Sequence, residues 1–329
     1  MTDDTSRPLD GLLVVDLSRH LPGPFASREL LRRGARVVRL EAPEGDPLRR
    51  LVPAWHRALN AGKESVVCDL KREPEFGRAL CAQADVVLEG FRPGVAKRLR
   101  VGAEDLPDRV IYCSISGFGP TGPHATRVGH DLNYLGFAGV LAATAPALPP
   151  LPIADLAAGS LTAVNEILLA LYQRTQTGRG RRLDISMTHR AHALQSYRHV
   201  DEELSRLLTG AFACYGMYAA ADGRWLTVAA LEPPFFRRLC ELLGCPDLTA
   251  QQFDPGAQEK LTALLAEIFG SRTATEWLQL FEPEEVCVGP VNTLSEAVAE
   301  FGVPETAAPV AELGAHTDQW RAALCRMMS

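Results

Sequence analysis

The sequence predicts an α/β protein in which a doubly wound, Rossmann-like parallel sheet is accompanied by a smaller α+β domain. Short apolar runs alternate with helical segments through roughly the first 190 residues, and this alternation is typical of parallel sheets. The apolar residues of each run are contiguous, as in residues 12–15, which indicates strands buried on both faces. After residue 214 the pattern changes to a hairpin followed by helices.

These changes of pattern predict the domain organisation. We expect a large, ligand-binding α/β domain at residues 1–190, a linker helix region at 191–214 and a small α+β domain at 215–304. The C-terminal segment, about residues 305–329, is expected to return to the large domain. Long helices are expected to join the two domains.

Glycine and proline mark the ends of several expected elements. Gly34 follows the helix at 25–33 as a C-cap, and Pro74 begins the helix at 74–84. An Asp-Gly pair within 215–230 predicts a hairpin turn. In the large domain the expected strands are 12–16, 35–41, 65–69, 85–89, 110–116 and 182–187, the expected long helices are 156–175 and 188–208, and 42–62 is expected to be loop-rich. The remaining expected helices are 234–243, 257–270, 274–280, 294–300 and, at the C-terminus, 318–327.

Composition and charge are ordinary for a globular protein. The chain has 329 residues, of which 47% are hydrophobic, and its formal net charge is -6. No run of Lys and Arg is long enough to suggest a nucleic-acid surface. The N-terminal residues lack the apolar stretch of a signal peptide, and no apolar run approaches the ~20 residues of a membrane span. We therefore expect a cytoplasmic protein without a nucleic-acid or membrane partner.

Cysteine spacing and the absence of a glycine fingerprint bear on cofactors. The eight cysteines form no CxxC pair and match no zinc spacing, so we expect reduced thiols and no metal site. No GxGxxG follows the first expected strand, which argues against a dinucleotide site. In doubly wound sheets ligands bind at the carboxyl ends of the strands, and we expect the functional site at that edge.

Two residues are suited to acid–base chemistry. His130 stands between Gly129 and Asp131 in a loop expected to border the ligand, and histidine titrates near neutrality, so it can act as acid and as base. Asp155 precedes the apolar helix at 156–175, and we expect it to act as the N-cap. Because a helix N-terminus lowers the pKa of a carboxylate, Asp155 is expected to be ionised at pH 7. The two side chains could flank one carbon atom, one removing a proton and the other returning it.

Several motifs occur in a characteristic order over residues 9–300. They are DLSRHLPGPF at 16–25, GKESVVCDLK at 62–71, EGFRPGV at 89–95, SISGFGPTGP at 114–123, GHDLNYL at 129–135, IADLAAG at 153–159, RTQTGRG at 174–180 and LEPPFF at 231–236. In this order they resemble the alpha-methylacyl-CoA racemase branch of the family III CoA-transferases (CaiB/BaiF).

This resemblance implies an acyl-CoA racemase or epimerase. Such an enzyme interconverts the 2-position stereocentre of a 2-methyl-branched, or related 2-substituted, acyl-CoA by 1,1-proton transfer through an enolate. His130 and Asp155 match the acid–base pair, and Glu232 matches a carboxylate that pairs with the histidine and orients its ring. We expect backbone N–H groups at the start of the helix that follows Asp155 to face the thioester oxygen.

The resemblance also implies a CoA-binding surface and a partner. Basic residues suit the pyrophosphate and 3'-phosphate of CoA. The residues implied near the adenine and the phosphates are Cys68, Asp69, Leu70, Lys71, Gly90, Phe91, Arg92 and Arg98. Those implied beside the pantetheine and the thioester are Gly129, Asp131, Leu132, Asn133 and Tyr134. CoA enters as part of the substrate, with no permanently bound cofactor, and the expected assembly is an interlocked homodimer.

Two alternatives use the same residues differently. A family III CoA-transferase would move CoA between carboxylic acids with Asp155 as the nucleophile, through a mixed anhydride and an aspartyl-CoA thioester. It would not require His130 or Glu232. The second alternative is a non-catalytic protein that binds CoA thioesters.

Two departures from the family pattern concern the substrate. Ala42 stands where racemases often carry an arginine, so one phosphate contact is either missing or supplied by Arg39 or Arg49. The loop at 140–154 is compact and rich in proline. The acyl group, the pathway and the stereochemical preference do not follow from the sequence.

Overall fold

The computed structural model describes residues 7–199, 204–303 and 308–328. It divides the chain into two compact units, one formed by Met1–Leu194 with Glu305–Ser329 and the other by Gln195–Pro304. The chain thus leaves the first unit, builds the second, and returns to the first. Each unit has a hydrophobic core of its own.

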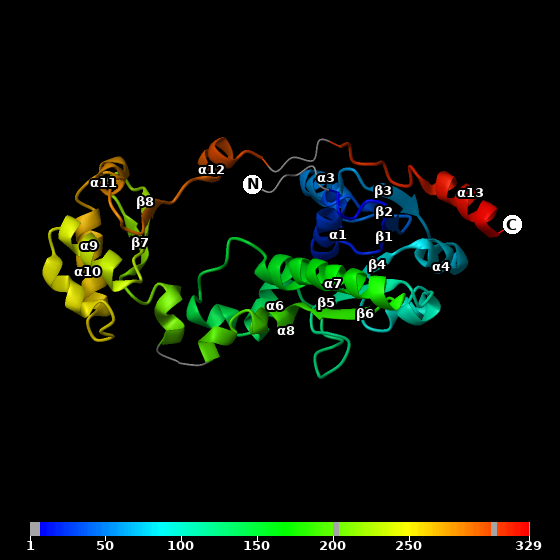
Figure 1. The fold of residues 1–329 in the computed structure, drawn as a ribbon, viewed down its shortest axis with the longest axis horizontal. Helices are drawn as coiled ribbons and strands as arrows, with labels where there is room; N and C mark the ends of the chain where they lie inside the picture. The colour runs from blue at the N-terminus through cyan, green and yellow to red at the C-terminus, as the bar shows by residue number, and fades with distance from the viewer. Residues whose placement is uncertain (1–6, 200–203, 304–307, 329) are drawn as a thin grey trace. The chain divides into compact units, whose positions relative to one another are not determined.

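The first unit is built on a parallel sheet whose strands run in the order β3-β2-β1-β4-β5-β6 (Figure 1). All neighbouring strands pair in parallel. The strands are β1 (Leu13–Asp16), β2 (Arg36–Glu41), β3 (Glu64–Val67), β4 (Val86–Glu89), β5 (Ile111–Ser116) and β6 (Arg182–Ser186). This order and the helices on both faces confirm the predicted doubly wound, Rossmann-like sheet.

Side chains of the sheet alternate between two cores. Val14 faces a core formed with α1 (Pro22–Arg32) and α7 (Thr162–Thr177). Val15, the next residue, faces a second core formed with α4 (Pro74–Gln83) and α13 (Thr317–Met328). The continuous apolar runs of the sequence follow from this burial on both faces. The shorter helices of this unit are α2 (Leu48–Leu51), α3 (Pro53–Asn60), α5 (Val95–Arg98), α6 (Asp131–Phe137) and α8 (Met187–Ala193), with 3-10 turns at Ala103–Asp105 and Val140–Ala143.

The C-terminal segment covers the free edge of β3. The backbone N–H of Ser65 donates to His316 Nδ1 (3.2 Å), and the N–H of His316 donates to the carbonyl oxygen of Ser65 (2.9 Å). The N–H of Val67 donates to Thr317 Oγ1 (3.0 Å). These bonds satisfy backbone groups that an edge strand otherwise leaves open.

Buried polar groups fix the loop between β1 and α1 by hydrogen bonds. Asp16 accepts from the backbone N–H of Ser18 (2.8 Å) and from the hydroxyl of Ser27 (2.5 Å). The ammonium group of Lys63, a residue only 3% exposed, donates to Ser27 Oγ and to the carbonyl oxygen of Pro24, each at 2.7 Å. A buried charge is tolerated when hydrogen bonds surround it in this way. The loop is therefore held against the sheet at the point where β1 and β4 lie side by side.

Two expectations for local structure are wrong. The segment 42–62 contains α2, which is preceded by Pro47, and α3, which begins at Pro53, and proline suits a helix start because it lacks an N–H. The long helix expected at 188–208 is replaced by α8 and by 3-10 turns at Ser196–His199 and Leu204–Thr209, while residues 200–203 lie outside the described part. This segment mixes polar and apolar residues, so no continuous stripe stabilises a longer helix.

The apolar helix beginning near residue 154 is partly π-helical. A π-helical segment, Ala154–Leu161, continues directly into α7, which ends at Gly178 in the left-handed conformation (φ 69°). By length and composition, Ala154–Thr177 is apolar enough to cross a membrane, although no such run was expected from the sequence. Half of its most apolar stretch is buried inside the protein, as in the core helix of a globular domain, so this is weak evidence for a span.

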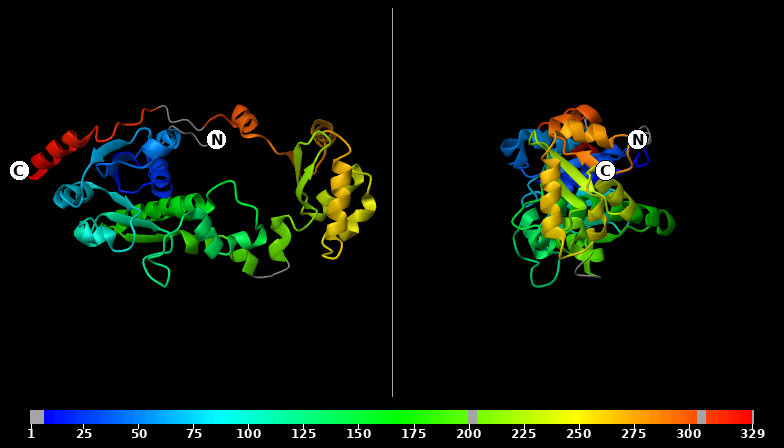
Figure 2. Two further views of the ribbon diagram at one scale, coloured as in Figure 1. Left: turned by 180° about the vertical axis from the view of Figure 1, so that it is seen from behind. Right: turned by 90° about the vertical axis from the view of Figure 1, so that its left-hand side faces the viewer.

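The second unit packs helices against one side of a small antiparallel sheet (Figures 1 and 2). Its strands are β7 (Tyr215–Ala219), β8 (Trp225–Ala229) and β9 (Val288–Pro290). Its helices are α9 (Pro233–Leu242), α10 (Gln258–Phe269), α11 (Ala274–Phe281) and α12 (Leu294–Phe301), with a 3-10 turn at Pro246–Gln251. Tyr218 stacks on Phe269 (5.1 Å between ring centroids), so the predicted hairpin is packed onto α10.

Candidate active site

Two adjoining cavities lie at the carboxyl ends of the strands of the first unit. One, of about 510 Å³, is bordered by the loops after β1, β2 and β3. The other, of about 650 Å³, is bordered by the loops after β1, β4 and β5. Ser18, Arg19 and Phe91 line both cavities. They stand where the strand order reverses between β1 and β4, the position at which doubly wound sheets bind ligands.

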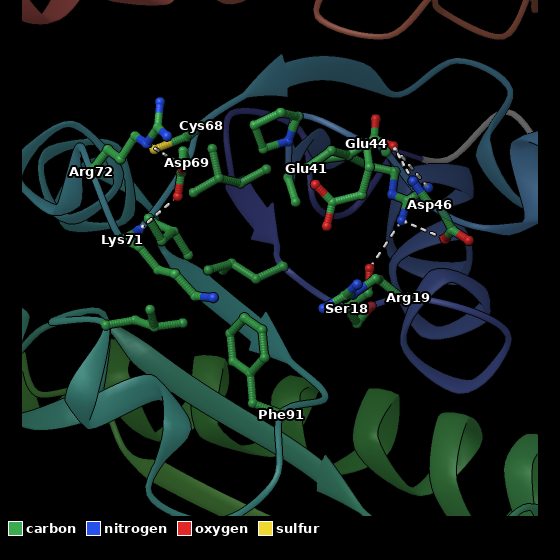
Figure 3. Close-up of a pocket in the computed structure, with 18 residues that line it drawn as sticks. Ser18, Arg19, Glu41, Glu44, Asp46, Cys68, Asp69, Lys71, Arg72 and Phe91 are labelled. Carbon is green, nitrogen blue, oxygen red and sulfur yellow. Dashed lines mark hydrogen bonds and ion pairs between the residues drawn. The ribbon is translucent and has the colours of Figure 1, made fainter.

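The smaller cavity contains the segment expected near the adenine of CoA. Cys68, Asp69, Leu70 and Lys71 all line it. Figure 3 shows the side chain of Lys71 extending into the cavity toward Phe91, while Arg72 points away from its centre. The turn is fixed because Asp69 Oδ1 accepts the backbone N–H of Lys71 (3.0 Å). An ammonium group on a preformed turn is suited to a phosphate ester.

Neither of the two arginines expected to replace a missing phosphate contact is free to do so. Arg39 is buried, and its Nη2 donates to Asp46 Oδ2 and to the carbonyl oxygen of Ser18, each at 2.9 Å. Arg49 donates to both carboxylate oxygens of Glu41 (2.9 and 2.7 Å). Although burial alone would raise the pKa of Glu41, these hydrogen bonds and charges hold it at about 2. Both guanidinium groups therefore hold the loop after β2 in place.

Arg19 is a basic residue that lines both cavities and was not predicted from the sequence. It is exposed, lines both cavities, and directly follows Ser18 in the loop after the first strand. The next residue, His20, also lines the larger cavity and has a left-handed backbone (φ 66°). Such a conformation is uncommon outside glycine and is found at functional sites. The position of Arg19 in the loop after a buried strand, three residues beyond its end at Asp16, was the signal that could have identified it.

His130 lies at the larger cavity on a loop held by its neighbours. It is exposed and occupies the N-cap position of α6, where its backbone N–H donates to Asn133 Oδ1 (3.0 Å). The hydroxyl of Tyr134 donates to the carbonyl oxygen of Gly129. A Cβ on Gly117 would stand 2.4 Å from the ring of Tyr134, so glycine is required there. The ring of Tyr134 thus fixes the turn that presents His130.

Asp155 lines the same cavity but is not the N-cap of its helix. The π-helical segment begins one residue earlier, at Ala154, and Ile153 occupies the cap position. The backbone N–H of Asp155 donates to Asp131 Oδ1 (2.9 Å). That N–H is therefore bound to the carboxylate of Asp131. We expected backbone N–H groups at this helix start to face the thioester oxygen, and for the N–H of Asp155 this expectation is wrong.

The pKa of Asp155 is shifted in the direction opposite to the one expected. Burial, followed by the negative charge of Asp131, raises the pKa of Asp155 to about 7. The backbone N–H of Asp155 donates to Asp131 and does not stabilise the carboxylate of Asp155 itself. Near pH 7 the carboxyl group therefore exists in comparable amounts as acid and as base, which suits a group that must both accept and donate a proton.

The other predicted contacts fall into three groups. Gly90, Arg92, Gly129, Asn133 and Tyr134 line the larger cavity together with His130 and Asp155. Asp131, Leu132 and Arg98 belong to α6 and α5 and line neither cavity. Glu232 belongs to the second unit, where it is the exposed N-cap of α9. Arg127 and Met187 line the larger cavity and were not predicted.

Comparison with known proteins gives the relationship of this chain. Residues 9–311 match CoA-transferase family III. Alpha-methylacyl-CoA racemase from Homo sapiens is 36% identical over 311 residues, which cover 88% of this chain and 79% of the relative. Succinyl-CoA:glutarate CoA-transferase from Homo sapiens is 30% identical over 325 residues, covering 89% and 74% respectively. Acetyl-CoA:oxalate CoA-transferase from Acetobacter aceti is 33% identical over 332 residues, covering 92% and 84%.

The fold agrees with this relationship. The crystal structure of Rv3272 from Mycobacterium tuberculosis superposes with a TM-score of 0.83 at 28% identity, over 96% of this chain and 99% of that one. A CaiB/BaiF family protein from Brucella suis superposes with a TM-score of 0.81 at the same identity, over 97% and 100%. The matched region includes both cavities and the motifs around them. The chain is a member of CoA-transferase family III.

Proposed function

We propose that this protein is an acyl-CoA racemase that inverts the 2-position of a 2-methyl-branched, or related 2-substituted, acyl-CoA. The observation that carries the proposal is that His130 and Asp155 line one cavity, and that the pKa of Asp155 is raised to about 7. A 1,1-proton transfer requires an acid–base group on each side of the α-carbon, and a carboxyl group with a pKa of about 7 can both accept and donate a proton. The 36% identity to a racemase over most of the chain supports the same activity.

The proposed reaction proceeds through an enolate. The thioester carbonyl acidifies the α-hydrogen, one of the two residues removes that proton, and the other returns a proton to the opposite face of the carbon. In the reverse direction the two roles are exchanged. Lys71 and Arg19 bind the phosphates of CoA in the smaller cavity, and the pantetheine arm passes Phe91 into the larger one.

We further propose that two copies of the chain assemble and that Glu232 orients the imidazole of His130. The helix that carries Asp155 supports an interface, because Leu161, Leu169 and Tyr172 on it are at least half exposed. A second copy covering this face would remove their apolar side chains from water. We also propose a cytoplasmic location without nucleic-acid or membrane partners, supported by eight free cysteines and a net charge of -6.

CoA transfer is the second candidate activity, because CoA-transferases stand among the relatives. In that reaction Asp155 attacks the thioester as a carboxylate nucleophile. Transfer does not require His130, which lines the same cavity as Asp155, and the identity to a racemase (36%) is higher than to these two transferases (30% and 33%). Both observations favour proton transfer. A protein that binds CoA thioesters without catalysis is the third candidate.

An exchange experiment distinguishes the three candidates. A panel of short, long and aryl 2-methylacyl-CoA thioesters is incubated with the protein in deuterated buffer, and α-deuterium is measured by mass spectrometry. A racemase incorporates deuterium and converts each enantiomer into a mixture. A transferase instead moves CoA to an added carboxylic acid and forms a covalent adduct on Asp155. Binding of CoA thioesters with neither result identifies the non-catalytic protein and refutes the proposal.

A further inference from the structure

Asp131 is adjacent to the proposed acid–base residue His130 in sequence, yet its contacts are to the other one, Asp155. Its carboxylate accepts the backbone N–H of Asp155 at 2.9 Å and receives a second backbone hydrogen bond from Ala154. It does not line the cavity in which His130 and Asp155 meet. Asp131 is therefore placed behind the site, against the first turn of the π-helical segment.

We propose that Asp131 is a positioning residue for Asp155. Asp131 caps two N–H groups at the start of the helix that carries Asp155, and it keeps a negative charge beside the carboxyl group of Asp155. This role differs from the substrate contact that the family resemblance implies for Asp131. The inference rests on the proposed racemase function for its effect on turnover, but the placement of the two carboxyl groups does not depend on the reaction.

The capping role follows from where the hydrogen bonds go. A helix begins with N–H groups that have no partner within the helix, and here a side chain 24 residues earlier in the chain supplies one. Asp155 itself cannot cap this turn, because it lies inside it. Its own carboxyl group therefore remains available to the cavity.

The electrostatic role follows from the surroundings of Asp155. The elements that pack against its turn are α1, α6, α7, α8 and strands β5 and β6. Burial raises the pKa of Asp155 most, and among the charged groups of the described residues Asp131 on α6 raises it further. The pKa of Tyr134, also on α6, is raised to about 12 by burial and by the charges of both aspartates. The remaining titratable or charged residues at the cavity are Arg19, His20, Arg92, Arg127 and His130, while α1 and α8 contribute the uncharged Pro22, Gly23 and Met187.

Removal of the charge without removal of the cap tests this proposal. In Asp131→Asn the amide oxygen can still accept the N–H of Asp155, and in Asp131→Ser the hydroxyl retains a capping acceptor if the asparagine variant does not fold. Asp131→Glu keeps the charge. Asp108→Asn is the matched control, because it removes the same charge from an exposed residue of the first unit that pairs with Arg179.

The readout is the titration of Asp155 itself. It is monitored by carboxyl-carbon NMR on protein labelled with ¹³C at aspartate, and the Asp155 signal is assigned by its absence from the spectrum of Asp155→Asn. We expect the midpoint of Asp155, about 7 in the parent, to move to lower pH in Asp131→Asn. It should stay raised in Asp131→Glu and remain unchanged in Asp108→Asn. For each unit by which the midpoint falls, the ratio of protonated to ionised Asp155 at pH 7 falls about tenfold.

The pH profile of α-proton exchange gives the second readout. The part of the pH profile in which the exchange rate changes with the ionisation of Asp155 should move to lower pH in Asp131→Asn. If Asp131 had a purely structural role, its substitution would lower the exchange rate equally at every pH. A folded Asp131→Asn in which Asp155 titrates as in the parent overturns the proposal. Absence of exchange in the parent enzyme would refute the racemase function alone, because the NMR titration decides the role of Asp131 without any substrate.

Discussion

The hydroxyl oxygen of Ser160 lies 2.7 Å from the carbonyl oxygen of Pro22 and 2.8 Å from that of Asp155. Ser160 is fully buried, so no water can replace these contacts. It connects the turn that carries Asp155 to the start of α1, where Pro22 and Gly23 line the same cavity. The hydroxyl of Ser160 thus links the turn that carries Asp155 to the loop after β1, at the point where the strand order reverses.

Ser160→Ala should raise the activation free energy of α-proton exchange by more than it lowers the free energy of unfolding. A neutral hydrogen bond contributes about 0.5–1.5 kcal/mol to the free energy of unfolding, whereas a catalytic group displaced by about 1 Å slows the reaction about 10²-fold, or about 2.7 kcal/mol in the barrier. Thr162→Val is the matched control, because its hydroxyl binds the carbonyl oxygen of Ala157 in the same helix (3.2 Å) without touching Pro22 or Asp155. Chemical denaturation and α-deuterium exchange are measured for both variants. Equal loss of activity in the two would show that Ser160 does not position Asp155.

Single substitutions of the two acid–base residues should have opposite stereochemical consequences. His130→Ala and Asp155→Ala should each abolish racemisation, because each removes the group on one face of the α-carbon. Loss of a general base costs about 10²–10⁴-fold in rate. The remaining base should still exchange the α-proton of the one enantiomer that it faces. Exchange is therefore measured with each pure enantiomer, after circular dichroism has shown that the variants fold. Racemisation by His130→Ala at the parental rate would overturn the assignment of His130 as one of the two acid–base residues.

Glu232→Gln should reduce racemisation less than His130→Ala does. The amide keeps the shape of the side chain but loses the charge that would favour one tautomer and orientation of the imidazole. Because the ring itself remains, the variant should retain partial activity and shift the pH profile of the limb that reports His130. Glu241→Gln, which removes an acceptor of Arg238 on the same helix, serves as control. A Glu232→Gln enzyme with a parental rate and pH profile would exclude the orienting role.

Asp155→Asn should stabilise the protein at neutral and alkaline pH. The pKa of Asp155 is raised from 3.8 to about 7 in the folded protein, so its ionisation opposes folding. The parent therefore loses stability as the pH rises from about 4 to about 7, and the uncharged variant does not. We expect the variant to be more stable by about 1–2 kcal/mol at pH 8, less than the full shift implies because water reaches part of the side chain. Thermal unfolding at pH 4 and pH 8 measures this, and an equal difference at the two pH values would contradict it.

Local pattern was enough to predict the sheet. The contiguous apolar residues of β1, β2, β4 and β5 need burial on both faces, and a parallel sheet with helices on both sides is the arrangement that provides it. The motifs then placed the ligand site at the strand ends, where two cavities are found. The short strand β9, Val288–Pro290, was missed because three residues that include glycine and proline carry no strand pattern.

The protonation of Asp155 could not be predicted, because it depends on a contact made by folding. In the sequence Asp155 stands before an apolar helix, a position that predicts a cap and a lowered pKa. Asp131 takes over the cap and adds its own charge, and no periodicity indicates that pairing. Arg39 was misjudged for the same reason, since its buried partners Asp46 and Ser18 are set by tertiary structure.

The hydrogen bonds between β3 and the C-terminal segment have a consequence for synthesis on the ribosome. The residues of all six strands of the large sheet have been synthesised once the ribosome reaches Ser186. The side chains that hydrogen-bond to the edge of β3 belong to His316 and Thr317, which are synthesised much later. Throughout translation of the second unit, the nascent sheet presents an open strand edge to other chains. A protein terminated before residue 308 would keep that edge permanently, and we expect it to aggregate although every proposed acid–base and CoA-binding residue is present.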